Sequence, residues 1–378
     1  MTVHPLVALD IGSTKVACAI GLPHDRSPGF ELVGSSLVPY PLLSEAWLGD
    51  LLMVSRTIEQ ALEATAVTGD FDQALVAMNH PSLKSEQVRT AVTLGDEPVM
   101  VRAQDLERLQ TAALNQVLGI DREPLLVERI GCAGNGFEGV RDPRGLFATR
   151  LVGTFHVLTI PLAGRRAIIQ AVEAAGLEVA QLRYTLPPAL ASVEDEALAQ
   201  RRVLLIDAGG LSTDVGLFVE GVLHAARIVP LGGLTLAAAI ARESEVTMDQ
   251  AIAWSLEGTA CRKPNVHALV ERHWGPLEQA IDEILANEPR PDAALVTGRG
   301  ALIDGFAEWV ERTTGIDTSV GRNARMARAG DLSRQVGVSP AIGLLELATR
   351  APGGSSLRSP HLFNRLIDRT RTILTEYF

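Results

Sequence analysis

The stretch that decides the fold runs from Val203 to Phe218 and reads VLLIDAGGLSTDVGLF. It begins as an apolar run, which is typical of a buried strand, and then reaches Asp207 followed by two glycines. Glycines at such a turn let main-chain N–H groups approach phosphate oxygens, because no Cβ stands between them. The stretch therefore predicts a strand–turn–strand hairpin that binds phosphate, although Leu211 stands where a phosphate loop would have a third glycine.

A second stretch, residues 8–20 with the sequence ALDIGSTKVACAI, follows the same plan. Its hydroxyl groups can donate hydrogen bonds to phosphate oxygens, and Lys15 can neutralise phosphate charge. One such turn is weak evidence, because Asp and Gly also occur in hairpins for reasons of turn geometry. Two of them about half a chain apart, followed by VTGRGALIDGF at residues 296–306, form a specific pattern.

These turns define the candidate site. The residues of the two turns expected to bind phosphate are Asp10, Gly12, Ser13, Thr14, Lys15, Asp207, Gly209, Gly210, Ser212 and Thr213. Asp10 and Asp207 are also expected to hold a hydrated Mg²⁺ through water. The histidines are scattered, and the three cysteines are far apart without a CxxC, so no other metal site is predicted.

Composition sets the broad class. The chain has 378 residues and is 47% hydrophobic, which predicts two or more domains with large cores. Its formal net charge of −11 argues against a nucleic-acid partner. The first residues lack the pattern of a signal peptide, and no window approaches the ~20 apolar residues of a membrane span. The cysteines are expected to be small buried thiols in a reducing compartment.

The two turns and residues 296–306 resemble the two phosphate motifs and the adenosine motif of the actin-like superfamily. The resemblance implies that Gly298, Arg299 and Gly300 also bind the nucleotide. Within this superfamily the chain is most similar to the FtsA family, as seen in GVRDPRGLFATRLVGTFHVLTIP at 139–161 and ARIVPLGGLTLAAAIA at 226–241. The resemblance covers about residues 5–350 and the terminal segment. It implies an α/β, actin-like two-lobed fold with an FtsA-type extra subdomain and a C-terminal amphipathic helix.

The resemblance also implies an order of parts along the chain. The expected parts are 1–82 for the start of the first lobe, 83–156 for the inserted subdomain, 157–200 for the rest of the first lobe, 201–225 for the second lobe, 226–290 for its small subdomain, 291–350 for the second lobe and the return to the first, 351–361 for a flexible linker, and 362–378 for the amphipathic helix.

The chain departs from the family pattern in the nucleotide motifs. Leu211 replaces a glycine of the second phosphate motif, and Arg299 replaces one of two adjacent glycines in the adenosine motif. The loop at Leu211 either shifts and still binds the nucleotide phosphate or binds it less well. We favour impaired binding. Arg299 can either block the adenine or stack on it, because guanidinium groups stack on flat rings.

Two further departures concern the bound nucleoside and the attacking water. The family's glutamate and lysine near the ribose and adenine fall on Ala251 and Trp254. Leu186 or Pro187 takes the place of a glutamate that helps orient the attacking water, and neither can polarise it. We therefore assign no catalytic residue and expect weakened or absent ATP turnover. The first turn is intact, so weak binding of ATP and Mg²⁺ stays open.

The terminal segment, LFNRLIDRTRTILTEYF, divides cleanly on a helical wheel. Its apolar face consists of Leu362, Phe363, Leu366, Ile367, Ile373, Leu374, Tyr377 and Phe378. Such a face must be buried, either on the chain's own domain or at a membrane surface. The Pro-, Gly- and Ser-rich linker argues against docking, and arginines on the other face suit anionic headgroups. We favour burial of this face at a membrane surface over docking on the chain's own domain.

The resemblance implies a role in bacterial cell division at the cytoplasmic face of the membrane, at the division site. The partners implied are the C-terminal peptide of FtsZ bound by residues 226–290, the anionic membrane surface, other division proteins, and further copies of the chain in actin-like filaments. One alternative is a PilM-like scaffold of the type IV pilus, against which the terminal segment argues. The other is an active ATPase or sugar kinase of the same superfamily.

Overall fold

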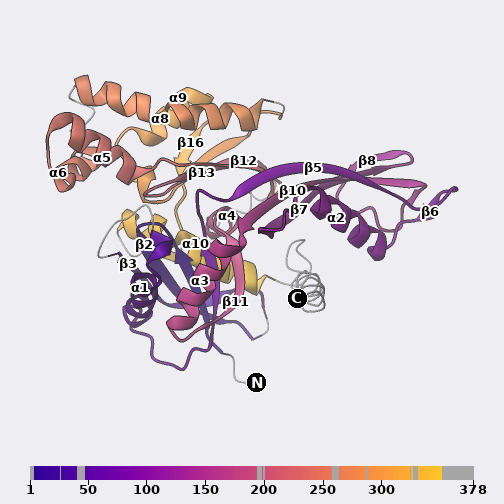
Figure 1. Cartoon of the computed structure of the whole chain (residues 1–378), viewed down its shortest axis with the longest axis horizontal. Coiled ribbons are helices and arrows are strands. Elements are labelled where there is room, and N and C mark those ends of the chain that lie inside the picture. Colours follow the sequence, from indigo (N-terminus) through magenta and orange to yellow (C-terminus); the bar gives the residue numbers. More distant parts are fainter. Residues whose placement is uncertain are drawn as a thin grey trace.

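A computed structural model describes residues 4–25, 27–40, 47–193, 198, 201–257, 264–286, 288–323, 325–326 and 331–350. Figure 1 shows two lobes, one above the other, and an inserted subdomain that extends to one side. The predicted linker 351–361 and amphipathic helix 362–378 lie outside the described residues.

The first lobe is built on a five-stranded sheet in the order β11-β4-β1-β2-β3. Its strands are β1 (Leu6–Ile11), β2 (Lys15–Pro23), β3 (Phe30–Pro39), β4 (Gln73–Met78) and β11 (Glu178–Tyr184). β1 pairs antiparallel with β2, and β2 with β3, whereas β1, β4 and β11 are parallel. The carboxyl ends of β1, β4 and β11 therefore lie at one edge of the sheet.

Alternation along β1 sends side chains to two different cores, since successive strand residues face opposite ways. Leu9 and Ile11 join the core with α1 (Leu51–Glu63) and α3 (Leu162–Ala174). Ala8, on the other face, packs with α10 (Leu332–Thr349). A short 3-10 helix, η1 (Trp47–Gly49), precedes α1.

The second lobe repeats this topology. Its sheet has the order β14-β13-β12-β15-β16, with antiparallel pairs β12–β13 and β13–β14 and parallel pairs β12–β15 and β15–β16. The strands are β12 (Arg202–Ala208), β13 (Thr213–Val219), β14 (Val222–Val229), β15 (Ala293–Thr297) and β16 (Thr318–Val320). Because the two sheets match strand for strand, β1–β2 and β12–β13 are equivalent hairpins.

Helices cover the outer face of the second sheet. They are η3 (Arg299–Leu302), α5 (Gly233–Ser244), α6 (Met248–Leu256), α8 (Pro264–Leu285) and α9 (Phe306–Thr314). An aromatic cluster locks α8 to α9, with the Trp274 ring centroid 5.4 Å from that of Phe306 and 5.1 Å from that of Trp309. Among the described helices, none combines the length and the apolar character that crossing a membrane requires.

The inserted subdomain lies between β4 and α3. Its elements are β5 (Lys84–Thr93), β6 (Val99–Met100), α2 (Ala103–Val117), β7 (Arg122–Gly134), β8 (Phe137–Val140), β9 (Phe147–Ala148) and β10 (Arg150–Pro161). The main sheet has the order β5-β10-β7-β8, and β6 pairs with β9. α2 covers one face of the sheet, where Leu109 packs with Leu151 and Phe155. The subdomain is entered through β5 and left through its neighbour β10, and Lys84 lies opposite Thr159.

Two helices connect the lobes, α10 and the short α4 (Leu186–Ser192). A Cβ at Gly343 of α10 would overlap the carbonyl oxygen of Pro188, so the two helices cross at a distance that only glycine permits. The short α4 ends at Ser192, and residues 194–197, 199 and 200 lie outside the described part of the chain.

Candidate functional site

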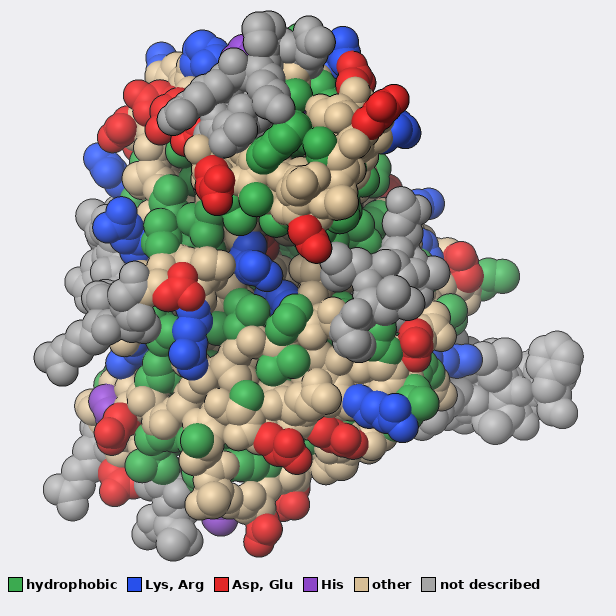
Figure 2. Space-filling model, turned by 90° about the vertical axis from the view of Figure 1, so that its left-hand side faces the viewer, with side chains coloured by type: hydrophobic (Ala, Val, Ile, Leu, Met, Phe, Trp, Pro, Cys, Tyr) green, Lys and Arg blue, Asp and Glu red, His purple; other side chains and the backbone are tan. Residues whose placement is uncertain are grey.

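The equivalent hairpins face each other across a cleft between the lobes. Each closes with the same main-chain bond, Gly12 N–H to Lys15 O at 3.0 Å and Gly209 N–H to Ser212 O at 2.9 Å. Figure 2 shows Lys and Arg side chains in the hollow between the upper and lower halves of this side of the molecule. The repeat of one strand topology thus brings two turns 197 residues apart, Gly12 and Gly209, to one place.

The two turns touch. The Leu211 N–H donates to Ser13 Oγ at 3.3 Å, and a Cβ at Gly210 would overlap the Thr14 side chain. The cavity between them has a volume of about 60 Å³. Pockets that enclose cofactor-sized ligands have roughly 300–1,000 Å³. In this arrangement of the lobes the cavity cannot enclose a nucleotide.

Most of the predicted site residues line this cavity. They are Asp10, Gly12, Ser13, Thr14, Lys15, Asp207, Gly209, Gly210, Ser212, Gly298 and Arg299. Thr213 is buried behind it and donates to Leu231 O at 2.8 Å. Gly300 packs on the main chain of β12, where a Cβ would lie 2.8 Å from Ala208 O. These two positions support the turns and do not face the cavity.

Further lining residues come from places that the motifs do not cover. They are Asn79, Pro81, Thr185, Val336, Gly337 and Pro340. Asn79 follows the end of β4, and Thr185 follows the end of β11. Ligands of open α/β sheets bind outside the carboxyl ends of parallel strands. That rule, applied to the strands QALVAM and EVAQLRY, is the signal that could have found both residues.

The cavity floor carries interacting charges. Lys15 Nζ forms an ion pair with the Asp10 carboxylate, and both side chains are largely buried. Loss of hydration raises the pKa of Asp207 to about 7; repulsion from Asp10 adds to the rise, and Lys15 opposes it. Ionisation of the second carboxylate is therefore suppressed while the first stays paired with the lysine.

A third carboxylate, Asp214, is completely buried and joins the lobes. Tyr184 Oη donates to its Oδ1 at 2.9 Å, and Asn79 Nδ2 donates to its Oδ2 and, at 3.1 Å, to Ser212 Oγ. Burial raises the pKa of Asp214 well above its ordinary range, and Asp207 adds to the rise. Both donors belong to the first lobe and the acceptor to the second.

The four departures from the family motifs have distinct structural settings. Leu211 is half-buried against the hydrophobic cluster shared by the lobes and is absent from the cavity lining. In this closed arrangement its side chain packs on that cluster, and the predicted impairment of nucleotide binding stays a prediction. Arg299 lines the cavity and donates from Nε to Ser333 Oγ of α10 at 3.3 Å, so it spans the two lobes.

The other two departures lie in packed surroundings. Leu186 is fully buried, and a Cβ at Gly216 of β13 would come within 2.6 Å of its Cδ1. Ala251 is buried in the core of the second lobe, and Trp254 is half-buried against it. Apolar packing occupies these positions, and none of the three residues offers a group that could activate water.

The chemistry of the cavity suits a phosphate better than a free metal ion. Lys15 and the hydroxyl groups of Ser13, Thr14 and Ser212 are suitable donors, and the buried Thr185 Oγ1 has no hydrogen-bond partner. Within the described ranges, no group of three or more His, Cys, Asp or Glu side chains is arranged to hold a metal. The donor set therefore suits phosphate groups, although the closed cavity is too small for a nucleotide.

Elsewhere the described surface offers little. A depression of about 570 Å³ lies at the ends of α1 and α3 and includes Asp70 and Asp72, but it is shallow and far in sequence from the phosphate turns. Cys18 and Cys132 are buried and free of disulfides, as expected, and burial raises the pKa of Cys18 to about 12. Cys261 lies outside the described residues.

Comparison with known proteins addresses the inserted subdomain first. A family model described as the SHS2 domain inserted in FtsA matches residues 81–159. Cell division protein FtsA of Rhizobium meliloti is 29% identical over 261 residues, which cover 66% of this chain and 58% of the relative. The FtsA of Pseudomonas aeruginosa is 27% identical over 230 residues, which cover 60% and 54% of the two chains.

The chain is FtsA-like. Its fold is actin-like, in agreement with the sequence prediction. The FtsA-like chain spans a little over half of the length of the two curated relatives. Among solved structures, the PilM–PilN type IV pilus biogenesis complex gives a TM-score of 0.70 at 16% identity, covering 92% of this chain and 100% of the other. The ethanolamine utilization protein EutJ from Carboxydothermus hydrogenoformans gives 0.53 at 13% identity, covering 92% and 90%. These likenesses concern the fold alone.

Proposed function

We propose that the chain acts in cell division, where it links filaments of the tubulin-like protein FtsZ to the inner face of the cytoplasmic membrane. The observation that carries the proposal is the inserted subdomain, because the FtsA model matches it along residues 81–159. The curated relatives are cell division proteins, which supports the same role.

The proposed membrane contact is the segment 362–378. Its apolar residues would lie at the acyl boundary, while its arginines would face anionic headgroups at about 1 kcal/mol each. A single short helix of this kind binds reversibly, so self-association into actin-like filaments would add avidity. The small subdomain at residues 226–290, which includes α5, α6 and α8, is the proposed site for the FtsZ C-terminal peptide.

The proposed role of the cleft is to position the lobes rather than to hydrolyse ATP. Leu186 or Pro187 takes the place of a water-orienting glutamate, and Leu186 is buried in the core. If the lobes open, Lys15 and the turn hydroxyls would face the phosphates of a weakly bound ATP. Asp10 and Asp207 would then hold Mg²⁺ through water.

The test uses the full chain and vesicles of phosphatidylglycerol and phosphatidylcholine in a flotation assay. Leu366→Glu places a charge on the apolar face, and Thr372→Glu makes the same charge change on the polar face. The first variant should lose flotation, and the second should lose less, because it retains the apolar face. Equal flotation of Leu366→Glu and the wild type would exclude the terminal segment as the anchor.

A second candidate function is scaffolding of a type IV pilus, because the PilM–PilN complex shows that the same fold can serve that role. Fluorescence anisotropy with a labelled FtsZ C-terminal peptide, and with PilN in parallel, separates the two. Binding of the FtsZ peptide alone supports the division role. Binding of PilN alone replaces it with the pilus role.

A further inference from the structure

The inserted subdomain belongs to the first lobe by chain connection, yet it is hydrogen-bonded to the second. In β10, Phe155 and Val157 face α2, whereas His156 between them faces the opposite way. On that side the sheet meets the β13–β14 hairpin of the second lobe, and three side chains of the subdomain hydrogen-bond to the hairpin main chain. They are Arg141, His156 and Gln87.

Arg141 holds the hairpin at its turn. Its Nη2 donates to Val219 O at 2.7 Å, its Nη1 to Glu220 O at 3.4 Å, and the guanidinium forms an ion pair with the Glu220 carboxylate at 3.1 Å. Glu220 and Gly221 have φ values of 49° and 76°, so both central residues of this two-residue turn lie in the left-handed region. Such turns match the twist of the flanking strands and hold them in register.

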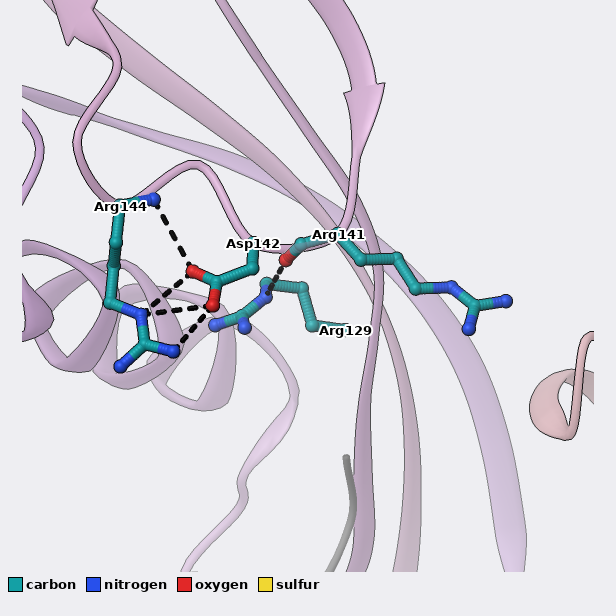
Figure 3. Close-up of polar contacts among 4 residues, drawn as sticks. All are labelled: Arg129, Arg141, Asp142 and Arg144. Atoms are coloured by element: carbon teal, nitrogen blue, oxygen red, sulfur yellow. Dashed lines mark hydrogen bonds and ion pairs between the residues drawn. The ribbon is translucent and has the colours of Figure 1, made fainter. Parts of the chain in front are cut away.

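The loop that carries Arg141 is itself braced. Arg129 Nε of β7 donates to Arg141 O at 2.7 Å, and the neighbouring Asp142 pairs with Arg144 (Figure 3). Figure 3 shows the Arg141 side chain pointing away from that pair. Arg141 and Arg144 therefore lie on one loop but bind on opposite sides, Arg141 to the second lobe and Arg144 within the subdomain.

His156 adds a buried contact beside the turn. It is fully buried, with Nδ1 3.1 Å from Leu223 O and Nε2 2.8 Å from Ser85 Oγ. A carbonyl only accepts, so Nδ1 carries the proton and Nε2 accepts from the serine. Gln87 Nε2 donates to His224 O at 2.9 Å. The subdomain thus binds three successive parts of the hairpin.

The same hairpin reaches the cleft at its other end. β13 begins at Thr213, next to Ser212 in the cavity lining, and ends at Val219, which Arg141 holds. Seven residues of strand span about 20 Å. The strand is paired on both sides, with β12 and with β14, so a continuous strand joins the Arg141 contact to the cleft; its register with β14 shifts between Leu217 and Phe218.

We propose that the Arg141 contact couples the inserted subdomain to the cleft, so that displacement of the subdomain and movement of the second phosphate turn are one event. A partner that pulls on or binds to the inserted subdomain would thereby change the opening of the lobes. By reciprocity, a ligand that opens the cleft would change the affinity of the subdomain for that partner. The coupling is additional to the proposed tethering role and does not depend on it.

The experiment is hydrogen exchange by mass spectrometry on the full chain. Arg141→Gln removes both main-chain bonds and the ion pair, whereas Arg144→Gln makes the same substitution on the same loop and removes only the pair with Asp142. Peptides covering residues 219–224 report the turn, and those covering 209–216 report the cleft. Arg141→Gln should speed exchange in both regions by about tenfold, since the loss of each hydrogen bond changes an opening equilibrium several-fold. Arg144→Gln should leave both within about twofold of the wild type.

The other outcomes would overturn the proposal. Faster exchange at 219–224 with wild-type exchange at 209–216 would mean that Arg141 is a local contact with no link to the cleft. Equal effects of the two variants would mean that the loop is merely destabilised. If Arg141→Gln does not fold, Arg141→Lys, which keeps the charge but cannot form both bonds in the same geometry, is measured in its place. Unchanged exchange at 209–216 in the lysine variant would likewise count against the coupling.

Discussion

At Asp214, two side chains of the first lobe hydrogen-bond to one carboxylate of the second. Tyr184 supplies one of the two donors, at 2.9 Å, and both Tyr184 and Asp214 are buried. An unpaired buried acceptor costs more than a bond that was never formed, because its desolvation is not compensated. The contact between the lobes at this point is therefore expected to be sensitive to a single hydroxyl.

Tyr184→Phe should lower the free energy of unfolding by about 1–2 kcal/mol, because it removes one donor and leaves the Asp214 carboxyl buried. Urea unfolding of the full chain measures the change. Ser319→Ala, at an exposed position of β16, is the control and should stay within ~0.5 kcal/mol of the wild type. A loss no larger than that of the control would show that Asp214 does not need its tyrosine partner.

The pH dependence of stability should report on Asp207. Its pKa is raised from 3.8 to about 7 in the folded chain, so the folded state keeps a proton that the unfolded state releases. The contribution of this group to stability is present below pH ~4 and is lost as the pH rises to ~7. Asp207→Asn removes that loss, so the variant should gain stability relative to the wild type between pH 4 and pH 7. Parallel unfolding curves across that range would contradict the raised pKa.

Leu211→Gly separates packing from ligand binding. The Leu211 side chain packs on the hydrophobic cluster between the lobes, so its removal should cost about 1–3 kcal/mol of stability. It does not line the cavity, so the glycine should not create ATP affinity that the wild type lacks. Calorimetry with ATP and Mg²⁺ on both proteins measures this. Binding by the glycine variant alone would mean that the leucine blocks the phosphate space after all.

At the scale of elements, α4 and α10 cross so closely that no side chain larger than that of glycine fits at position 343 of α10. Gly343→Ala would place a methyl group onto the Pro188 carbonyl, where main chain must shift to make room. A loss of about 3 kcal/mol or more is expected, or a chain that does not fold. Gly164→Ala in α3 meets nothing nearer than Ile160 Cγ1 at 3.9 Å and should be neutral or stabilising by up to ~1 kcal/mol. Thermal unfolding of both variants compares their losses of stability. Equal losses would mean that α4 and α10 can separate enough to accept the extra methyl group.

The order of these elements could largely be predicted from the sequence. The alternation in ALDIGSTKVACAI and VLLIDAGGLSTDVGLF predicts the two hairpins, and the helical spacing near Leu51 and Ala103 predicts α1 and α2. Local pattern succeeds there because each element buries one face whose period is visible in a single stretch.

What the sequence did not reveal depends on contacts between stretches that are far apart. Asn79 belongs to the cavity only because β4 ends beside β1, and the distance from Asn79 to Ser212 is set by how the lobes meet. Leu211 was placed in the phosphate space by comparison of motifs, whereas its direction is decided by the hydrophobic cluster behind the turn. The contacts of Arg141 with the second lobe have no motif at all.

At the scale of the whole molecule, charge is distributed unevenly between body and tail. The net charge is −11, while the segment from Arg358 to the end is rich in arginine. Membrane binding should therefore depend on attraction at the tail that must exceed repulsion of the body. Flotation with anionic vesicles is expected to weaken as salt rises from low to above physiological concentration, because screening acts on exposed charges. Insensitivity to salt would mean that apolar burial alone holds the chain.

The entry and exit of the inserted subdomain lie on neighbouring strands, with Lys84 opposite Thr159. A tight hairpin could therefore close the gap if all the residues between them were removed, and neither lobe would have to change its path. Because the two ends are adjacent, a single recombination event could add, exchange or remove the subdomain. The contacts of the subdomain with the β13–β14 turn would have to be formed anew in each chain that acquired it.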